Sequence, residues 1–487
     1  MTQPTLDEAE ALLAAGRAAE ALMMAEIGLA QRPADGGLAS LRDRALAAIS
    51  AMDPAFAALQ LDAAVNAEKP AAHLELGHAY AVREQWADAE RCFVQALALE
   101  SASAEAHASL GFVHLNAGEE EAAERHARAA LALDEAHVVA CQTLASLLEA
   151  RGEPEAARAQ LDRAYARQAL FELTAPQAAL RVLVLATVSA GNVPYKTIMP
   201  PARYSRLVWY MEHARPQDAP DASRYDIVFN TIGDADLAEP SLASVERFAA
   251  ACPKPLLNPP ERVMRTRRDR LADVLGGLEG VVVPRTVRVS AEDVARRGLK
   301  ALAEAHGFLA PLLARPAGLH GGQGMVLAEA LEDLDAAPPA EADHYLIQFV
   351  DYRSGDGLFR KFRVLFVGGE PFAYHEAISD HWLVHHDTAG MGDRPERQAE
   401  EARFLEDPRA IIGQSAADAV ERIGRALGLD YCGVDFSVLP DGRLLVFEAN
   451  ATMLAHRENP AGPYAYKNPY VDGIAEAFQA LLRRRTA

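Results

Sequence analysis

The chain has 487 residues, half of them apolar, and a formal net charge of −21. This length suits two to four domains of roughly 100–200 residues each. The charge is uneven, because residues 1–170 hold 26 acidic side chains against 13 basic ones and the remaining residues hold 43 against 35. Such an acidic surface repels polynucleotides and anionic membranes, so we expect no nucleic-acid and no membrane partner.

The cysteines and the first residues indicate a cytoplasmic protein. Four cysteines occur, far apart and in no metal-ligand spacing, which suits a reduced compartment. The start of the chain lacks the basic and apolar regions of a signal peptide. No stretch of about 18 apolar residues is free of charge, so we expect no membrane span.

Positions 34 residues apart match over the first third of the chain. The aligned sets are Leu76, Leu110 and Leu144; Gly77, Gly111 and Ala145; and Ala89, Ala123 and Ala157. Small residues at this period let two helices cross closely, and the pattern resembles the tetratricopeptide repeat. We therefore expect an all-α helical-repeat solenoid over 1–172. By that resemblance its groove holds a protein or peptide, or pairs two copies of the chain, and its acidity favours a basic partner segment.

The composition changes near residue 175, and alternating strand and helix patterns follow. Apolar strands are predicted at 181–186 and 225–230, each followed by a polar loop. This order is typical of an open parallel sheet, so we expect an α/β subdomain over 180–285 and further subdomains over 286–487. Ligands bind such sheets at the ends of the strands, which makes 187–200 and 230–235 candidate substrate contacts.

A hairpin near the C-terminus places three oxygen-bearing side chains together. Two apolar runs, 432–438 and 444–450, are joined by Pro-Asp-Gly, which is typical of paired antiparallel strands. Side chains alternate along a strand, so Glu448 and Asn450 share a face, and Asp435 lies on the partner strand. Carboxylate and amide oxygens suit Mg²⁺. The alternative is an ordinary edge hairpin whose acids face water.

Basic residues and glycines upstream suit phosphate groups. Arg315 ends a strand that opens into a loop containing Gly321, Gly322 and Gly324, and glycines let backbone N–H groups approach phosphate oxygens. Arg270 belongs to a basic run that is otherwise a solvated helix face. Arg363 lies in a predicted hairpin, where it either points into a cleft or faces water.

Taken in order, these motifs over 180–487 resemble the ATP-grasp superfamily, closest to its glutathione-synthetase and peptide-ligase members. The resemblance implies Mg²⁺ on Asp435, Glu448 and Asn450, and catalytic roles for Arg363 and Arg315. It also implies an ATP site, whose members are Arg270, Arg315, Gly321, Gly322, Gly324, Gln348, Phe349 and Val350. Arginine replaces the usual lysine at 270 and 315, and Lys361 stands where relatives commonly have an acid.

Substrate contacts are expected from two variable segments. They contain His381, His385, His386, Met453 and His456. Adjacent histidines are one indication of a zinc site, but no His-Glu-x-x-His or cysteine spacing accompanies them. We therefore assign these residues to substrate recognition rather than to chemistry.

The resemblance implies an ATP-dependent carboxylate–amine ligase that forms an amide through an acylphosphate. Its substrate would be an amino acid or peptide, with the repeats as a candidate recruiting surface. A kinase on the same fold and a nucleotide-binding interaction protein without turnover are the alternatives. The residues do not separate ligase from kinase.

Overall fold

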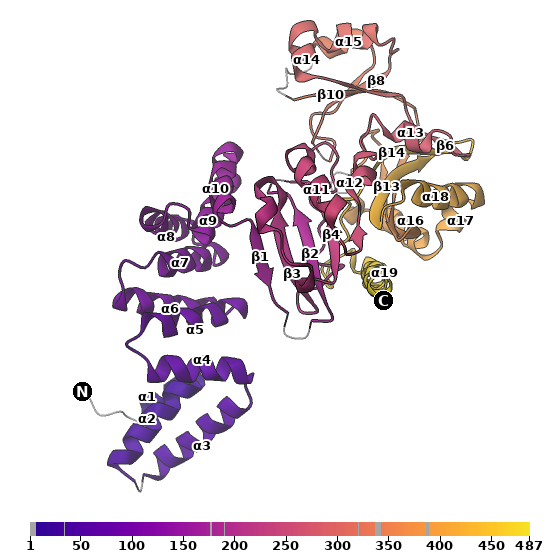
Figure 1. Ribbon diagram of the computed structural model, residues 1–487. Coiled ribbons are helices and arrows are strands. Elements are labelled where there is room, and N and C mark those ends of the chain that lie inside the picture. Colours follow the sequence, from indigo (N-terminus) through magenta and orange to yellow (C-terminus); the bar gives the residue numbers. More distant parts are fainter. Residues whose placement is uncertain are drawn as a thin grey trace. The chain divides into compact units, whose positions relative to one another are not determined.

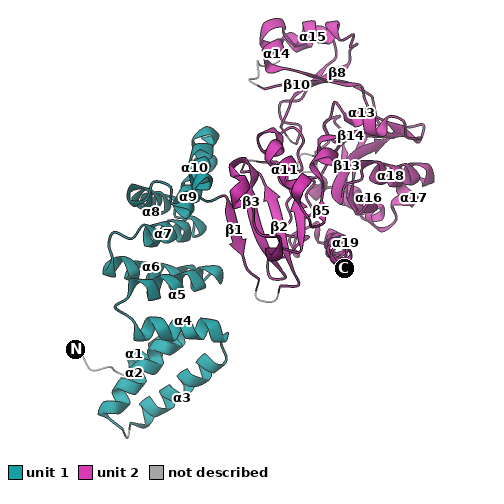
Figure 2. Cartoon of the chain, in the orientation of Figure 1, with its two compact units in different colours: residues 1–168 teal, residues 169–487 magenta. Residues whose placement is uncertain are grey.

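A computed structural model describes residues 6–33, 35–175, 178–188, 190–319, 321–336, 342–385 and 389–487. The chain forms two compact units, residues 1–168 and 169–487, which Figure 2 shows in different colours. No helix among the described residues is long and apolar enough to cross a membrane.

The first unit is built of helices that follow one another in antiparallel pairs (Figure 1). They are α1 (Leu6–Ala14), α2 (Ala18–Gln31), α3 (Gly36–Ser50), α4 (Pro54–Val65), α5 (Pro70–Val82), α6 (Trp86–Leu99), α7 (Ala104–Asn116), α8 (Glu120–Leu133), α9 (Val138–Ala150) and α10 (Pro154–Arg167). The start of α3 is capped by Asp35 and the start of α7 by Ser103, whose side chains accept bonds from backbone N–H groups. Proline opens α4, α5 and α10, where its missing N–H costs nothing.

The 34-residue period reflects close contact between the two helices of each pair. A Cβ atom on Gly77 of α5 would lie 2.5 Å from the ring of Phe93 on α6. One repeat later, a Cβ on Gly111 of α7 would lie 3.1 Å from the backbone nitrogen of Ala127 on α8. Glycine is needed at 77 because the large ring of Phe93 lies opposite. It is needed at 111, opposite the small Ala127, because the backbones of the two helices themselves approach there.

The second unit contains three sheets, and the first is mainly parallel. Its strands, in spatial order, are β1 (Leu170–Leu173), β3 (Tyr204–Tyr210), β2 (Leu180–Ala186), β4 (Ile227–Asn230) and β5 (Leu256–Leu257). β1 pairs antiparallel with β3, and all other pairs are parallel. The side chains from 182 to 186 are buried, as expected of a strand covered on both faces.

The second sheet is antiparallel and small. Its strand order is β7 (Thr286–Val289), β10 (His344–Gln348), β8 (Leu312–Pro316) and β9 (Val326–Ala328). Helices α14 (Ala291–Arg297) and α15 (Leu299–Ala305) share its core, in which Phe308 and Leu346 are fully buried.

The third sheet carries the predicted C-terminal hairpin. Its order is β12 (Glu370–Ser379), β11 (Phe359–Val367), β13 (Tyr431–Val438), β14 (Leu444–Asn450) and β6 (Val281–Val282). The antiparallel pairing of β13 with β14 confirms the hairpin. Between them Gly442 has a φ of +84°, which favours glycine.

The remaining helices fill the spaces around these sheets. They are α11 (Glu239–Ala251), α12 (Pro260–Met264), α13 (Leu271–Leu275), α16 (Pro395–Glu406), α17 (Pro408–Ile412), α18 (Gln414–Leu427) and α19 (Asn468–Thr486), with short 3₁₀ turns at Met211–His213, Pro216–Asp218, Ala222–Arg224, Leu331–Ala336, Met391–Asp393 and Ala465–Lys467. Phe478 of α19 contacts Phe229 on the first sheet and Tyr431 on the third, so one core joins both sheets. This element order confirms the predicted fold class, a helical solenoid followed by an α/β unit.

Candidate functional site

A cavity of about 550 Å³ lies between the second and third sheets of residues 169–487. Four cations line it, from β8, β11 and the segment before α13, together with two carboxylates from β13 and β14. These charged residues are Arg268, Arg315, Lys361, Arg363, Asp435 and Glu448. Apolar side chains line another part of the cavity, namely Leu313, Ile347, Phe349, Val350, Tyr352, Leu445 and Phe447. The cavity therefore joins a charged region to an apolar one.

Asp435 and Glu448 lie directly opposite each other on β13 and β14. The pairing shifts after Asp435, because Phe436 pairs with Val446 and leaves Phe447 as an extra residue. Such a bulge redirects the side chains of the strand that carries it. Before the bulge the register is regular, so Asn450, two residues beyond Glu448, shares its face, and Asp435, Glu448 and Asn450, the three predicted metal ligands, all line the cavity.

Asp435 is buried and is held by two cations from β11. Arg363 donates from Nε to Oδ1 at 2.6 Å and from Nη2 to Oδ2 at 2.8 Å, and the Nζ of Lys361 lies 3.4 Å from Oδ2. Burial alone would raise the pKa of the Asp435 carboxyl, but these cations outweigh burial and lower the pKa to about 2. Asp435 is therefore ionised throughout the neutral range.

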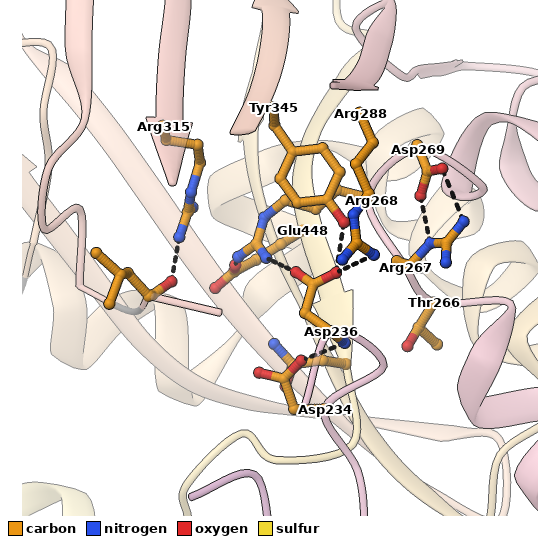
Figure 3. Close-up of polar contacts among 12 residues, drawn as sticks. Asp234, Asp236, Thr266, Arg267, Arg268, Asp269, Arg288, Arg315, Tyr345 and Glu448 are labelled. Atoms are coloured by element: carbon orange, nitrogen blue, oxygen red, sulfur yellow. Dashed lines mark hydrogen bonds and ion pairs between the residues drawn. The ribbon is translucent and has the colours of Figure 1, made fainter. Parts of the chain in front are cut away.

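Glu448 pairs with Arg268, and Figure 3 shows what surrounds this pair. Burial and the neighbouring Asp435 act to raise the pKa of Glu448, but Arg268, Arg315 and Arg363 together outweigh them and lower it. The Nη1 of Arg268 also lies 3.6 Å from Oδ2 of Asp236, which follows β4. Asp236 in turn accepts a hydrogen bond from Tyr345 of β10 and lies 3.5 Å from Arg288 of β7.

Arg315 reaches the cavity from β8, the strand paired with β10. It donates to the carbonyl oxygen of Leu319, and its Nε has no partner among the described residues. Burial, together with the nearby Arg268, lowers the pKa of the Arg315 guanidinium to about 10. A buried guanidinium that lies near another cation and has an N–H without a hydrogen-bond partner is stabilised by any anion that enters the cavity.

The glycine-rich loop approaches the cavity with its backbone. Gly321, Gly322 and Gly324 have φ values of +63°, +80° and +66°, the left-handed region that favours glycine. Gly321 and Gly322 line the cavity and face the segment around 383–385, since a Cβ on Gly322 would lie 2.7 Å from Leu383. Gly324 does not line it and packs beside Pro316 instead.

The segment Gln348, Phe349 and Val350 lines the apolar region. The backbone N–H of Gln348 donates to the carbonyl of Arg285 at 2.9 Å, and its side chain donates to the carbonyls of Leu309 and Pro311. The ring of Phe349 meets Trp382, 6.2 Å between centroids. The result is an apolar slot beside a strand whose backbone is hydrogen-bonded to neighbouring segments.

The structure places Arg270 away from the other predicted nucleotide-site residues. Its side chain is 61% exposed, faces Asp273 at 3.9 Å and does not line the cavity. Arg268, from the same basic run, lines the cavity in its place, and sequence reasoning missed it. No role was predicted for Lys361. Its position could have been inferred from Arg363, because side chains two apart on a strand share a face and Arg363 was already a candidate.

The predicted substrate residues divide into two groups. His385 and Met453 line the cavity. His381 is exposed, and His456 bonds through Nδ1 to the hydroxyl of Tyr374 at 2.9 Å, so neither lines the cavity. His386 lies outside the described residues.

No family model matches the chain, and no curated protein matches it. Solved structures do align with each unit. Carboxyaminoimidazole ribonucleotide synthase from Aspergillus clavatus, complexed with ATP, is 12% identical over 60% of this chain and 77% of that chain, with a TM-score of 0.37. A RimK domain ATP-grasp protein from Sphaerobacter thermophilus is 16% identical over 61% of this chain and 96% of its own, with a TM-score of 0.36.

The helical unit has its own neighbours. A tetratricopeptide-repeat protein from Thermus thermophilus is 24% identical over 34% of this chain and 89% of its own, with a TM-score of 0.22. At these identities the likeness of each unit concerns the fold alone.

Proposed function

We propose that residues 169–487 form an ATP-dependent carboxylate–amine ligase whose substrate is an amino acid or peptide. One observation carries the proposal: four cations and two carboxylates gather at one region of a cavity whose other region is an apolar slot. A nucleotide has the same division, with a flat base at one end and a chain of anionic phosphates at the other.

The residues present fit both ATP and Mg²⁺. The slot at Gln348, Phe349 and Val350 would hold the base, and Arg268, Arg315 and the backbone at Gly321 and Gly322 would hold phosphates. No three His, Cys, Asp or Glu side chains gather as a metal site in the described part of the chain. Glu448, Asn450 and Asp435 are hard donors, and Mg²⁺ in such sites is completed by phosphate oxygens and water.

Bound Mg²⁺ would supply charge neutralisation along the phosphates. The protein's part is to place a substrate carboxylate in line with the γ-phosphorus, so that the carboxylate oxygen forms the new bond while the bond to ADP breaks. Arg363 and Lys361 would offset the charge that develops there. The loop at 321–324, lying against 383–385, would keep water from the acylphosphate until an amine displaces phosphate.

Substrate recognition would involve His385 and Met453, which line the same cavity. The helical unit would recruit a protein or peptide partner, or a second copy of the chain, through its groove. Its excess of acidic side chains favours a basic partner segment.

The test is product formation from Mg-ATP with pooled amino acids and short peptides. ADP and inorganic phosphate released in equal amounts, dependent on the pool and lost in Glu448→Ala, support the ligase. ADP without inorganic phosphate identifies a kinase instead. Nucleotide binding with no turnover in any pool favours an interaction protein.

A further inference from the structure

The segment between β14 and α19 reaches the cavity without the support of regular structure. Thr452, Met453 and Leu454 line the cavity, and the residues from 451 to 464, all of them described, belong to no helix or strand. Outside helices and strands, a backbone must find its hydrogen bonds one by one. The hydroxyl of Tyr431 donates to the carbonyl oxygen of Met453 at 2.8 Å. The place of the other two side chains depends on contacts made further along the segment.

Two further groups bind the backbone of this segment. The backbone N–H of His456 donates to the hydroxyl oxygen of Tyr374 on β12 at 3.4 Å, and Nδ1 of the same histidine lies 2.9 Å from that oxygen. The side chain of Asn468, at the start of α19, accepts from the backbone N–H of Glu458 at 2.7 Å and donates to its carbonyl oxygen at 3.1 Å. The segment is therefore held at 456 and 458 as well as at 453.

A buried lysine, Lys467, contacts the residues that make these bonds. Its side chain is 3% exposed, and its Nζ lies 3.5 Å from Oε1 of Glu401 on α16 and 3.7 Å from Oε1 of Glu458. The rings of Tyr374 and Tyr464 face the ammonium, with centroids 5.2 and 5.9 Å away. Lys467 thus joins the segment to both α16 and β12.

Glu401 gives this lysine a fixed anchor. Its Oε1 accepts a hydrogen bond from the backbone N–H of Glu376 on β12 at 3.2 Å, and its Oε2 accepts one from the hydroxyl of Tyr466. Burial raises the pKa of the Glu401 carboxyl, and Lys467 and Tyr466 counteract that shift. The contacts of Lys467 lie outside the residues that line the cavity, so a bound ligand does not compete for them.

We propose that Lys467 is a positioning residue, which holds the segment after β14 so that Thr452, Met453 and Leu454 keep a fixed place in the wall that receives the substrate. This inference rests on the proposed function. His456, a predicted substrate contact, then acts through Tyr374 instead of touching the substrate. A buried ammonium between two carboxylates is costly to displace, and a shift of about 1 Å in a substrate-binding wall is enough to lower the rate strongly.

The experiment measures inorganic phosphate released by the full chain from Mg-ATP with the pool of amino acids and short peptides. Two values are determined: the total pool concentration and the Mg-ATP concentration that give half-maximal release. Lys467→Met should raise the pool value about tenfold or more and leave the Mg-ATP value within about twofold. Hydrogen exchange of peptides from 451–467 should accelerate in this variant.

The matched control is Lys300→Met on α15. Lys300 also pairs with a glutamate, Glu332 at 3.1 Å, but it lies outside the cavity. The same substitution there should leave both values within about twofold, as expected of an exposed pair.

A second variant tests whether Lys467 acts through the segment itself. Glu458→Gln removes the carboxylate that the segment offers to Lys467, and it should raise the pool value about 3- to 10-fold. In the Lys467→Met background it should add less than about twofold, because the contact is already lost. Effects that multiply independently overturn the inference. So does a Lys467→Met variant whose pool value stays at that of the parent, or whose Mg-ATP value rises as far as its pool value.

Circular dichroism establishes that each variant is folded. Where Lys467→Met does not fold, Glu458→Gln alone decides, and a pool value equal to that of the parent overturns the inference. A parent chain that releases no phosphate with any pool removes the proposed function and this inference with it. Turnover by the parent, together with unchanged hydrogen exchange of 451–467 in Lys467→Met, removes this inference alone.

Discussion

Arg363 and Asp435 lie directly opposite each other on β11 and β13 and form a two-bonded ion pair, with N–O distances of 2.6 and 2.8 Å. Both side chains are largely shielded from water, so each charge depends on the other. The planar fork of arginine matches the two carboxylate oxygens, which the point charge of lysine cannot do. The pair therefore sets the position of the guanidinium in the cavity.

The first prediction concerns loss of this guanidinium. Arg363→Met should lower the free energy of unfolding by about 2–4 kcal/mol, since Lys361 alone remains beside a buried carboxylate. If the proposed reaction is correct, turnover should also fall about 100-fold or more, because charge on the transferring phosphoryl group is no longer offset. Arg363→Lys should recover most of the stability and little of the turnover. Equal turnover in both variants and the parent would contradict a catalytic role.

A second prediction compares two arginines of one basic run. Arg268→Lys should raise the ATP concentration needed for half-maximal turnover by about tenfold, because a point charge replaces a bidentate contact. Arg270→Lys is the matched control: it makes the same change at a side chain that is exposed outside the cavity, and it should leave that concentration within about twofold. Steady-state kinetics over a range of Mg-ATP concentrations measures both. A larger effect of Arg270→Lys than of Arg268→Lys on that concentration would assign phosphate binding to Arg270 instead.

The sequence predicts the strands that carry the site better than it predicts which side chains of the connecting segments point into the cavity. The hairpin follows from two apolar runs and a Pro-Asp-Gly turn, and strand alternation then brings Glu448 opposite Asp435. Arg268 was missed because the run containing it is not one helix: α12 ends at Met264 and α13 begins at Leu271. Without a helical period, no rule distinguishes which arginine points inward.

The burial of an acidic side chain could not be predicted from the sequence pattern either. Asp236 follows a strand in a polar loop, which suggests a solvated turn, yet its side chain is 3% exposed. Its burial depends on Tyr345 and Arg288, which are adjacent on paired strands and more than fifty residues away in the chain. Contacts of that kind depend on the packing of two sheets, which composition and spacing do not encode.

A third prediction tests the close helix contact in the repeats. Gly77→Ala should destabilise the α5–α6 pair by about 1–3 kcal/mol, because the new methyl group would lie 2.5 Å from the ring of Phe93. Hydrogen exchange of peptides from 70–99 should accelerate. The same substitution at Gly473 of α19, which has open space around it, should instead stabilise its helix by about 0.5–1 kcal/mol. Phe93→Leu in the Gly77→Ala background should recover part of the loss, and independent effects of the two changes would contradict the contact.

The last prediction uses an acid buried away from the cavity. Glu376 of β12 is fully buried, beside Glu400 and Glu401 of α16, and the Nε of Arg360 lies 3.7 Å from it. Burial, reinforced by Glu400, raises the pKa of the Glu376 carboxyl to about 8. The folded chain therefore retains a proton there that the unfolded chain releases near pH 4.5, the ordinary value. Stability must fall as pH rises between these two values, and the full cost is present above pH 8.

Glu376→Gln removes this titration. Relative to the parent, the variant should gain about 4 kcal/mol of unfolding free energy between pH 5 and pH 9, whatever fixed cost the new amide brings. Urea unfolding at both pH values, followed by hydrogen exchange of peptides from 370–379, measures the difference. The exposed Glu370→Gln, on the same strand, is the control and should show no such pH dependence. A parallel pH profile for parent and Glu376→Gln would mean that the buried carboxyl is ionised at neutral pH, with Arg360 as its counter-ion.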